Sequence, residues 1–167
     1  PKHGKTGARF VQYGRRKGTR RFMSRRIERA RQILKEIFGF TSFRGDQEPV
    51  IETVLGEKSS LLLMPTGMGK SLCYQLPARV FSEEEKGLTL VISPLIALMK
   101  DQVDAALRKG LKAAFINSSL SSDERANRYR RLREGAYELL YVTPERFRIP
   151  EFVEALGHNR IALLAID

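Results

Sequence analysis

Five short apolar runs alternate with longer amphipathic stretches between residues 61 and 167. Each run is short and rich in leucine, isoleucine, valine or alanine, which is typical of strands buried on both faces. Strands that alternate with helices form a parallel sheet covered by helices on both faces. The sequence therefore predicts an α/β fold, with strands at 61–64, 88–92, 113–116, 139–142 and 161–166.

Helices are expected ahead of the first strand and between the strands. Ser121 and Glu124 form a capping box that opens one of them, and Ser24 is a suitable N-cap for another. The predicted helices are 24–39, 46–56, 70–80, 95–109 and 121–135. Because the last strand is followed by no helix, we expect the parallel sheet to be incomplete at its C-terminal end and the chain to be cut short.

The charge of the chain is concentrated at its N-terminus. Residues 1–31 contain twelve lysines and arginines and one acid, Glu28, whereas the remainder is neutral, so this segment carries the whole net charge of +11. Glycines punctuate the bases, and few aliphatic residues are present. We expect residues 1–23 to form a flexible basic arm ahead of one domain at 24–167.

Composition excludes several classes of protein. With 42% apolar residues in 167, the chain can build a core. No apolar run reaches the roughly 18 residues of a membrane span, so no membrane partner is expected. The single cysteine, Cys73, rules out an intramolecular disulfide and a cysteine-rich zinc site. We interpret it as inert packing in a protein of a reducing compartment.

A glycine-rich loop follows the first predicted strand and precedes a helix. Gly67 and Gly69 come directly before Lys70 and Ser71. Such glycines let backbone N–H groups point at a phosphate, and the helix N-terminus adds partial positive charge. Lys70 would reach the β- and γ-phosphates, and Ser71 would bind Mg²⁺. The pattern usually begins with a further glycine, where this chain has Met64.

The second Mg²⁺ ligand of such a site is an acid at the end of another strand. Asp167 directly follows the apolar run 161–166 and fits that role. An aspartate after a strand can also be a turn or cap residue, and the glycine loop is what favours the metal role. We therefore expect Lys70 and Asp167 to be the catalytic residues and Ser71 and Asp167 to hold Mg²⁺.

Several blocks resemble RecQ-type DNA helicases in sequence and in order. An F-G-aromatic segment at 38–40 is followed by F-R-x-x-Q at 43–47, and M-P-T-G-M-G-K-S occupies 64–71. S-P-L-I-A-L-M-K-D-Q-V follows at 93–103, Y-V-T-P-E-R at 141–146, and A-I-D at 165–167 looks like the start of a D-E-A-H box. The resemblance covers about residues 27–167 and accounts for Met64.

This resemblance implies the first RecA-like motor domain of a phosphate-loop NTPase, with ATP and Mg²⁺ as cofactors. It implies ATP hydrolysis coupled to 3′-to-5′ unwinding, single-stranded and forked double-stranded DNA as substrates, and a second RecA-like domain in the same parent chain. A bacterial protein would be cytoplasmic and associated with the nucleoid, and a eukaryotic one nuclear. The acid and histidine after Asp167 and the second domain are not in this sequence, so we expect this piece to bind nucleotide but not to unwind DNA or turn over ATP appreciably.

The resemblance also assigns residues to the nucleotide. Gln47 would read the adenine edge, where its amide offers both donor and acceptor. Phe40 would stack on the purine, although core packing is an alternative, and Arg44 would lie close by. The loop residues of the nucleotide site would be Met64, Pro65, Thr66, Gly67, Met68, Gly69, Lys70 and Ser71.

The resemblance implies that single-stranded DNA runs along the carboxyl ends of the strands, where the blocks at 93–103 and 143–146 lie. Hydroxyls and amides there suit phosphate contacts that are independent of sequence. For Lys100 and Gln102, a solvated helix face is an equal alternative. The candidate DNA contacts are Ser93, Pro94, Lys100, Gln102, Asn117, Thr143 and Arg146.

Two other functions compete. A DEAD-box-like RNA helicase shares the glycine loop, but it carries P-T-R-E-L-A and T-P-G-R where this chain has the blocks at 93–98 and 143–146. A non-enzymatic basic nucleic-acid-binding module would describe residues 1–23, where the charge lies. The arm would then add affinity that falls with salt, unless it is only a solvated tail.

Overall fold

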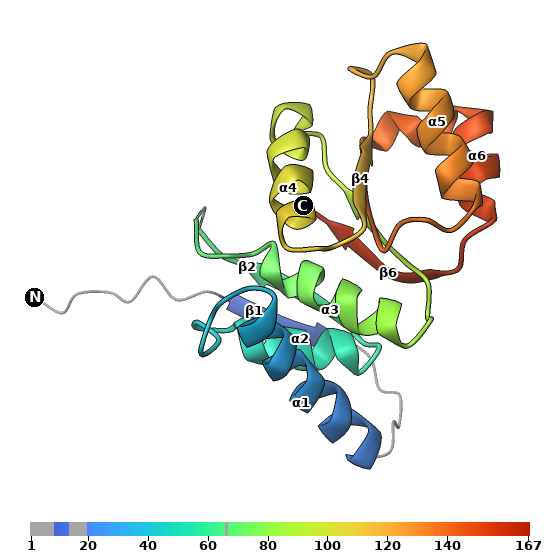
Figure 1. The fold of residues 1–167 in the computed structure, drawn as a ribbon. Coiled ribbons are helices and arrows are strands. Elements are labelled where there is room, and N and C mark those ends of the chain that lie inside the picture. Colours follow the sequence, from blue (N-terminus) through green and yellow to red (C-terminus); the bar gives the residue numbers. More distant parts are fainter. Residues whose placement is uncertain (1–8, 14–19, 66) are drawn as a thin grey trace, which may run out of the picture. The chain divides into compact units, whose positions relative to one another are not determined.

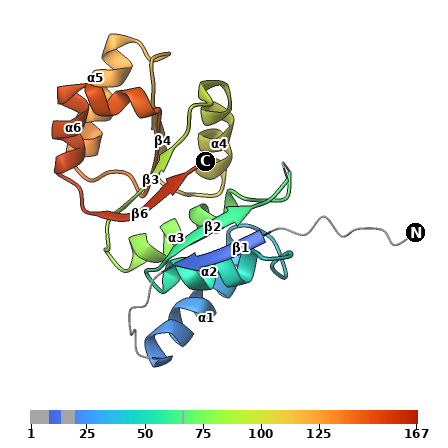
Figure 2. The ribbon, with the colours of Figure 1, turned by 180° about the vertical axis from the view of Figure 1, so that it is seen from behind.

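The computed structural model describes residues 9–13, 20–65 and 67–167, and the chain divides into two compact units, Pro1–Pro77 and Ala78–Asp167. Figures 1 and 2 show the elements from opposite sides. In chain order they are β1 (Arg9–Tyr13), α1 (Arg20–Glu36), α2 (Gln47–Leu55), β2 (Ser59–Leu63), α3 (Leu72–Glu83), β3 (Leu88–Ile92), α4 (Ile96–Arg108), β4 (Ala113–Ile116), α5 (Ser122–Arg133), β5 (Leu139–Val142), the 3₁₀ helix η1 (Pro144–Arg148), α6 (Pro150–Gly157) and β6 (Ile161–Ile166).

The second unit is built on a four-stranded parallel sheet in the order β4-β5-β3-β6. Ile92 at the end of β3 lies opposite Val142 of β5 and Ile166 of β6, and Val142 lies opposite Ile116 of β4. All four strands therefore end at one edge of the sheet. This confirms the predicted α/β class, and α4 and α5 lie on opposite sides of the sheet (Figure 1).

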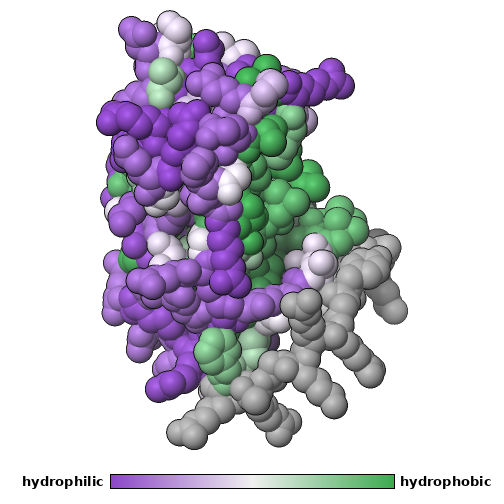
Figure 3. Space-filling model, turned by 90° about the vertical axis from the view of Figure 1, so that its right-hand side faces the viewer, coloured by the Kyte–Doolittle hydropathy of each residue, from purple (hydrophilic) through white to green (hydrophobic). Residues whose placement is uncertain are grey.

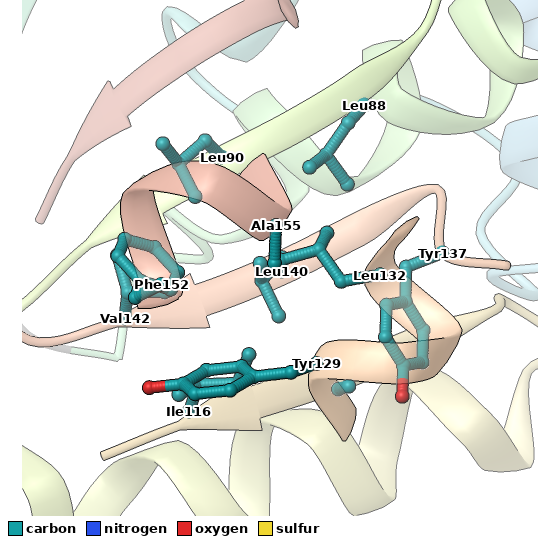
Figure 4. Close-up of a cluster of buried hydrophobic side chains, with 11 residues drawn as sticks. Leu88, Leu90, Ile116, Tyr129, Leu132, Tyr137, Leu140, Val142, Phe152 and Ala155 are labelled. Atoms are coloured by element: carbon teal, nitrogen blue, oxygen red, sulfur yellow. The ribbon is translucent and has the colours of Figure 1, made fainter. Parts of the chain in front are cut away.

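The core of this unit lies between the sheet and helices α5 and α6 (Figure 4). Successive side chains of a strand point to opposite faces, so alternate residues such as Leu90, Leu140 and Ile116 turn toward these helices. Tyr129 of α5 and Phe152 of α6 are fully buried there, with ring centroids 6.3 Å apart. Helix α5 begins at the predicted capping box of Ser121 and Glu124.

An ion pair between Glu138 and Arg79 lies at the amino ends of β4 and β5. Glu138, directly before β5, is 2% exposed, and its carboxylate lies 3.1 Å from the Arg79 guanidinium of α3. The same carboxylate accepts the backbone N–H of Lys112, directly before β4, at 2.9 Å. Arg79 also donates to the carbonyl of Gly110 at 2.5 Å. These bonds join α3, β4 and β5 at one point.

The first unit packs α1 against α2 beside a two-stranded sheet. Buried Arg26 of α1 donates to the carbonyl of Leu55 at the end of α2 and pairs with Glu57 at 3.2 Å. This bond satisfies a helix-terminal carbonyl that has no partner within α2. It joins α1 to the end of α2, and β2 and the glycine loop follow α2 in the chain.

The strand before the glycine loop differs from its prediction. The run 61–64 does form part of a strand, β2, but β2 pairs antiparallel with β1 rather than joining the parallel sheet. Leu61 and Leu63 are 50% and 56% exposed, and the other face of β2 is only partly buried. The partner comes from the basic segment, where Arg-Phe-Val-Gln-Tyr contains three residues that favour strands.

The N-terminal segment also differs in part from the expected arm. Residues 9–13 form β1, and α1 begins at Arg20, so Ser24 lies inside the helix and is not its N-cap. Residues 1–8 and 14–19 lie outside the described part.

None of the described helices combines the length and apolar character of a membrane span. The space-filling view shows hydrophobic residues gathered beside a hydrophilic region (Figure 3).

Candidate nucleotide site and carboxyl edge of the sheet

The glycine loop takes a backbone conformation that side chains disfavour. Gly67 and Gly69 have φ of +83° and +82°, in the left-handed region. Backbone bonds of the helical type begin at once, with Leu72 N–H on the carbonyl of Gly69 and Cys73 N–H on that of Lys70. Within the described residues, the N–H groups of Gly69 and Lys70 donate to no backbone carbonyl, and they precede a helix N-terminus. Such a cluster of donors suits an anion.

Lys70 lies across the loop that it ends. Its ammonium donates to the carbonyl of Met64 at 3.2 Å, which spans the loop from end to start. The Lys70 side chain is half-buried, and so is Ser71, the last residue before α3. A lysine held at this position carries its charge where the predicted β- and γ-phosphates would lie. Thr66, also predicted for the nucleotide site, lies outside the described residues.

Gln47 is hydrogen-bonded directly to the glycine loop. Its side-chain Nε2 donates to the carbonyls of Gly69 at 3.2 Å and Met68 at 3.4 Å, while its Oε1 accepts the N–H of Arg44 at 2.9 Å. The residue is 3% exposed. A Cβ added to Gly69 would lie 2.7 Å from the Gln47 Nε2. The predicted adenine motif and phosphate loop are therefore in contact, although 22 positions separate these residues.

Phe40 and Arg44 lie together at the surface beside this contact. The N–H of Phe40 bonds to the carbonyl of Leu34 across Gly39, whose φ is +73°, and this turn ends the helical region of α1. Phe40 is 41% exposed, so it does not pack in the core, which was the alternative to stacking on a purine. The Arg44 guanidinium lies 5.5 Å from its ring centroid. An exposed ring of this kind can stack on a base.

The second unit gathers four predicted residues at the carboxyl edge of its sheet. Ser93, Asn117, Thr143 and Asp167 each directly follow a strand, and the register aligns those strand ends. Ser93 N–H donates to the carbonyl of Val142, and Asp167 N–H donates to that of Ile92. The chain segments predicted to contact DNA thus lie side by side with the predicted metal ligand.

Their side chains are not equally accessible. Ser93, Asn117 and Thr143 are buried. Asn117 Oδ1 accepts both the N–H and the hydroxyl of Ser119, at 3.0 and 2.7 Å, so it shapes the loop that follows β4. The Ser93 hydroxyl accepts the N–H of Leu95 at 3.3 Å and fixes the start of α4.

The remaining candidates lie on the helices next to this edge. Pro94 is exposed ahead of α4, and Gln102 is half-buried within that helix. Lys100 is exposed and pairs with Asp104 at 2.7 Å, a hydrogen bond that raises the pKa of the ammonium group. Arg146 is half-buried in η1. Lys100 thus lies on an exposed helix face, which was the alternative to a DNA contact for this residue.

The residues predicted to hold a metal are the half-buried Ser71 of the first unit and the exposed Asp167 of the second. No cluster of three or more histidine, cysteine or acidic residues suited to a metal occurs in the described part of the chain. Mg²⁺ is usually held by one or two carboxylates together with substrate phosphates and water, so a single carboxylate can serve as its protein ligand. The residues therefore suit a metal that arrives with a nucleotide.

Sequence reasoning missed two features. The buried Arg79 and Glu138 pair gives no local signal, because its members are far apart in the chain. The basic face of α5 did leave a signal, since Arg128 and Arg131 are three residues apart and hence adjacent on a helix.

A parallel α/β sheet and a left-handed glycine loop before a helix together define a phosphate-loop nucleotide-binding protein. Residues 44–167 match the family model described as DEAD/DEAH box helicase. The chain belongs to this family.

Named relatives are similar over most of the chain. It is 47% identical over 138 residues to the ATP-dependent DNA helicase RecQ of Pasteurella multocida, 46% over 142 residues to that of Bacillus subtilis, and 44% over 147 residues to that of Haemophilus influenzae. These matches cover 83%, 84% and 87% of this chain but only 21%, 23% and 23% of the relatives. The chain thus spans about a fifth of their length.

Proposed function

We propose that the chain is the nucleotide-binding part of an ATP-dependent DNA helicase of RecQ type. The observation that carries the proposal is the contact between Gln47 and the backbone of the glycine loop. A residue suited to adenine and a loop suited to phosphates lie together. The relatives' names supply the nucleotide, ATP, and the substrate class, DNA.

Each predicted residue has a role in this proposal. The N–H groups of Gly69, Lys70 and their neighbours bind the phosphates, and the Lys70 ammonium moves from the Met64 carbonyl to a phosphate oxygen. Phe40 stacks on the adenine, with Arg44 beside it. Ser71 and Asp167 hold Mg²⁺, which neutralises negative charge on the phosphates when bound.

ATP hydrolysis in the whole protein requires more than these residues. Lys70 stabilises charge that develops on the transferred phosphoryl group, which accounts for only part of the rate. An arginine from a second RecA-like domain and the acid and histidine that follow the DEAH-box aspartate would complete the site. We therefore expect the 167-residue chain to bind ATP without appreciable turnover, and a DNA-dependent ATPase activity of the isolated chain would contradict this.

Single-stranded DNA would pass along the carboxyl edge. Ser93, Asn117 and Thr143 shape this edge, and Pro94, Lys100, Gln102 and Arg146 flank it. Contacts from such groups bind the phosphate backbone and are independent of base sequence. The whole protein would move 3′-to-5′ along this strand and separate forked DNA, in the cytoplasm of a bacterium or the nucleus of a eukaryote.

Strand displacement by the full-length protein tests this function. We expect ATP-driven unwinding of forked DNA and of duplexes with a 3′ tail, and loss of unwinding in Lys70→Ala. Unwinding of matched RNA duplexes alone would overturn the proposal in favour of an RNA helicase. Binding of DNA with no ATP hydrolysis would instead indicate a non-enzymatic module.

A further inference from the structure

A groove of about 660 Å³ lies between α4, β4 and α5 in the second unit. Figure 1 shows α4 and α5 on either side of β4. The groove has an apolar lining that includes Leu107, Leu111 and Phe115, and Leu107 is half exposed. Lys112, Arg128 and Arg131 also line it. All the residues that line it belong to the second unit.

The strand in this groove has one open edge. Among the described strands, β4 ends the sheet and pairs only with β5. The carbonyl of Lys112 accepts N–H groups from Glu138 and Leu139, so residue 112 faces the β5 side. Alternation along the strand then directs the backbone groups of Ala113 and Phe115 away from β5, where the Ala113 N–H donates to the carbonyl of Leu111 at 3.0 Å. The Arg128 guanidinium accordingly donates to the carbonyl of Phe115 from the open side.

The charge of the groove is positive, because the bases that line it, Lys100, Lys112, Arg128 and Arg131, outnumber its acids, Asp104 and Glu124. Asp104 pairs with Lys100 at 2.7 Å. Glu124 accepts the backbone N–H of Ser121 at 3.0 Å within the capping box, and this bond and that of the Ser121 hydroxyl lower the pKa of its carboxyl group. The groove therefore keeps an excess of positive charge, although Glu124 acts on Arg128 electrostatically.

Two arginines lie over aromatic rings in the groove. The Arg128 guanidinium is 4.1 Å from the ring centroid of Phe115, and that of Arg131 is 5.2 Å from that of Tyr137. Neither forms an ion pair within the described part of the chain. Burial lowers the pKa of Arg128, which means that this cation is partly desolvated and would gain from a carboxylate partner.

We propose that this groove binds an acidic peptide segment of a partner protein, added to β4 as an extended strand. An apolar side chain of the peptide packs on the half-exposed Leu107, and its carboxylates pair with Arg128 and Arg131. A peptide N–H replaces Arg128 on the Phe115 carbonyl, which releases the guanidinium for a stronger charge-assisted bond. The faces covered by arginines leave no free aromatic platform for nucleic-acid bases, which favours a peptide.

Fluorescence anisotropy of the chain with a fluorescein-labelled octapeptide of alternating aspartate and valine tests this proposal. We expect saturable binding that weakens with salt, and no binding of the matched lysine and valine octapeptide. Arg128→Gln and Arg131→Gln should each weaken binding about tenfold. Arg125→Gln is the matched control, because Arg125 lies on α5 but does not line the groove. Thermal melts verify that all variants are folded.

Peptide backbone chemistry separates strand addition from simple charge attraction. The same acidic octapeptide with N-methylated valines should bind at least tenfold more weakly, since it cannot donate to β4. Equal binding of the methylated or lysine peptide, or equal loss in Arg125→Gln, would overturn the proposal. Failure of the acidic peptide to bind, with an oligothymidylate bound through Arg128 and Arg131 instead, would also overturn it and identify a nucleic-acid surface.

Discussion

At the residue scale, the conformation of the glycine loop requires that Gly69 have no side chain. Gly69 combines a φ of +82° with a Gln47 amide nitrogen 2.7 Å from where a Cβ would lie. A side chain there would strain the backbone and displace Gln47 from the loop carbonyls. The loop shape and the proposed adenine recognition would thus depend on one contact.

We predict that Gly69→Ala weakens Mg-ATP binding at least tenfold, because both the loop and Gln47 must shift. Gly67→Ala is a matched control in the same loop: Gly67 has a φ of +83°, but no atom lies within 4 Å of an added Cβ. Titration with a fluorescent ATP analogue measures both. If the two variants bind alike, backbone strain rather than the Gln47 contact accounts for the effect.

A second residue-scale prediction concerns the Gln47 amide itself. Gln47→Glu replaces its donor with an acceptor opposite the carbonyls of Met68 and Gly69, at 3.4 and 3.2 Å. Repulsion should weaken ATP binding several-fold and reduce any preference for ATP over GTP. Gln32→Glu makes the same change on the exposed surface of α1 and should have no effect. Unchanged affinity and base preference in Gln47→Glu would argue against adenine recognition by this residue.

At the element scale, the Arg79 and Glu138 pair joins α3 to the starts of β4 and β5. We predict that Glu138→Gln lowers the free energy of unfolding by about 3 kcal/mol, because the Arg79 guanidinium, whose side chain is only 18% exposed, loses its counter-charge. Chemical denaturation measures this change. Glu52→Gln, at an exposed position of α2, should leave the stability within about 0.5 kcal/mol of the wild type. A comparable small loss in Glu138→Gln would mean that the pair contributes little.

The buried thiol of Cys73 in helix α3 makes the stability of the folded chain depend on pH. Burial raises the pKa of its thiol from 9.0 to about 12. The unfolded chain therefore loses this proton at a lower pH than the native state, so the stabilisation is complete below pH 9 and is lost as pH rises toward 12. We expect the native thiol to resist alkylation at pH 8, and Cys73→Ala to flatten the fall in stability above pH 9. Rapid alkylation of the folded chain would contradict the buried placement.

The elements also show what local sequence can predict. The strands from 88 onward, the capping box at Ser121 and the helix stops follow from side-chain periodicity and turn chemistry, which are local. The pairing of β2 with β1 was not predicted, because a strand's partner depends on residues far away in the chain. The pattern 61–64 resembles the other apolar runs, yet Leu61 and Leu63 are half exposed. Helices η1 and α6 were missed between 142 and 161.

For the site, sequence reasoning identified the residue types but not their hydrogen bonds. Gln47, Lys70 and the two glycines were predicted from spacing and family resemblance. Their contacts with loop carbonyls arise only when the chain folds back on itself. Asn117 illustrates the converse, because a residue expected at the DNA path proves to be buried and bonded to its own loop.

At the scale of the whole molecule, the net charge of the chain lies ahead of the unit that contains the parallel sheet. The net charge of +11 comes from residues 1–31, while the remainder is neutral. We predict that deletion of residues 1–8 reduces the salt dependence of DNA binding by the chain, because fewer counterions are released. Affinity for an oligothymidylate at two salt concentrations measures this. An unchanged slope would leave these residues without a role in DNA binding.

The central claim is that this chain binds Mg-ATP through its glycine loop, and calorimetric titration of the chain tests it most directly. The account predicts one saturable site, weakened at least tenfold in Lys70→Ala, because that ammonium lies on the Met64 carbonyl across the loop. Lys35→Ala, at an exposed position in the last turn of α1, should bind like the wild type. Equal affinity of Lys70→Ala and the wild type, or no saturable binding by either, would contradict the account.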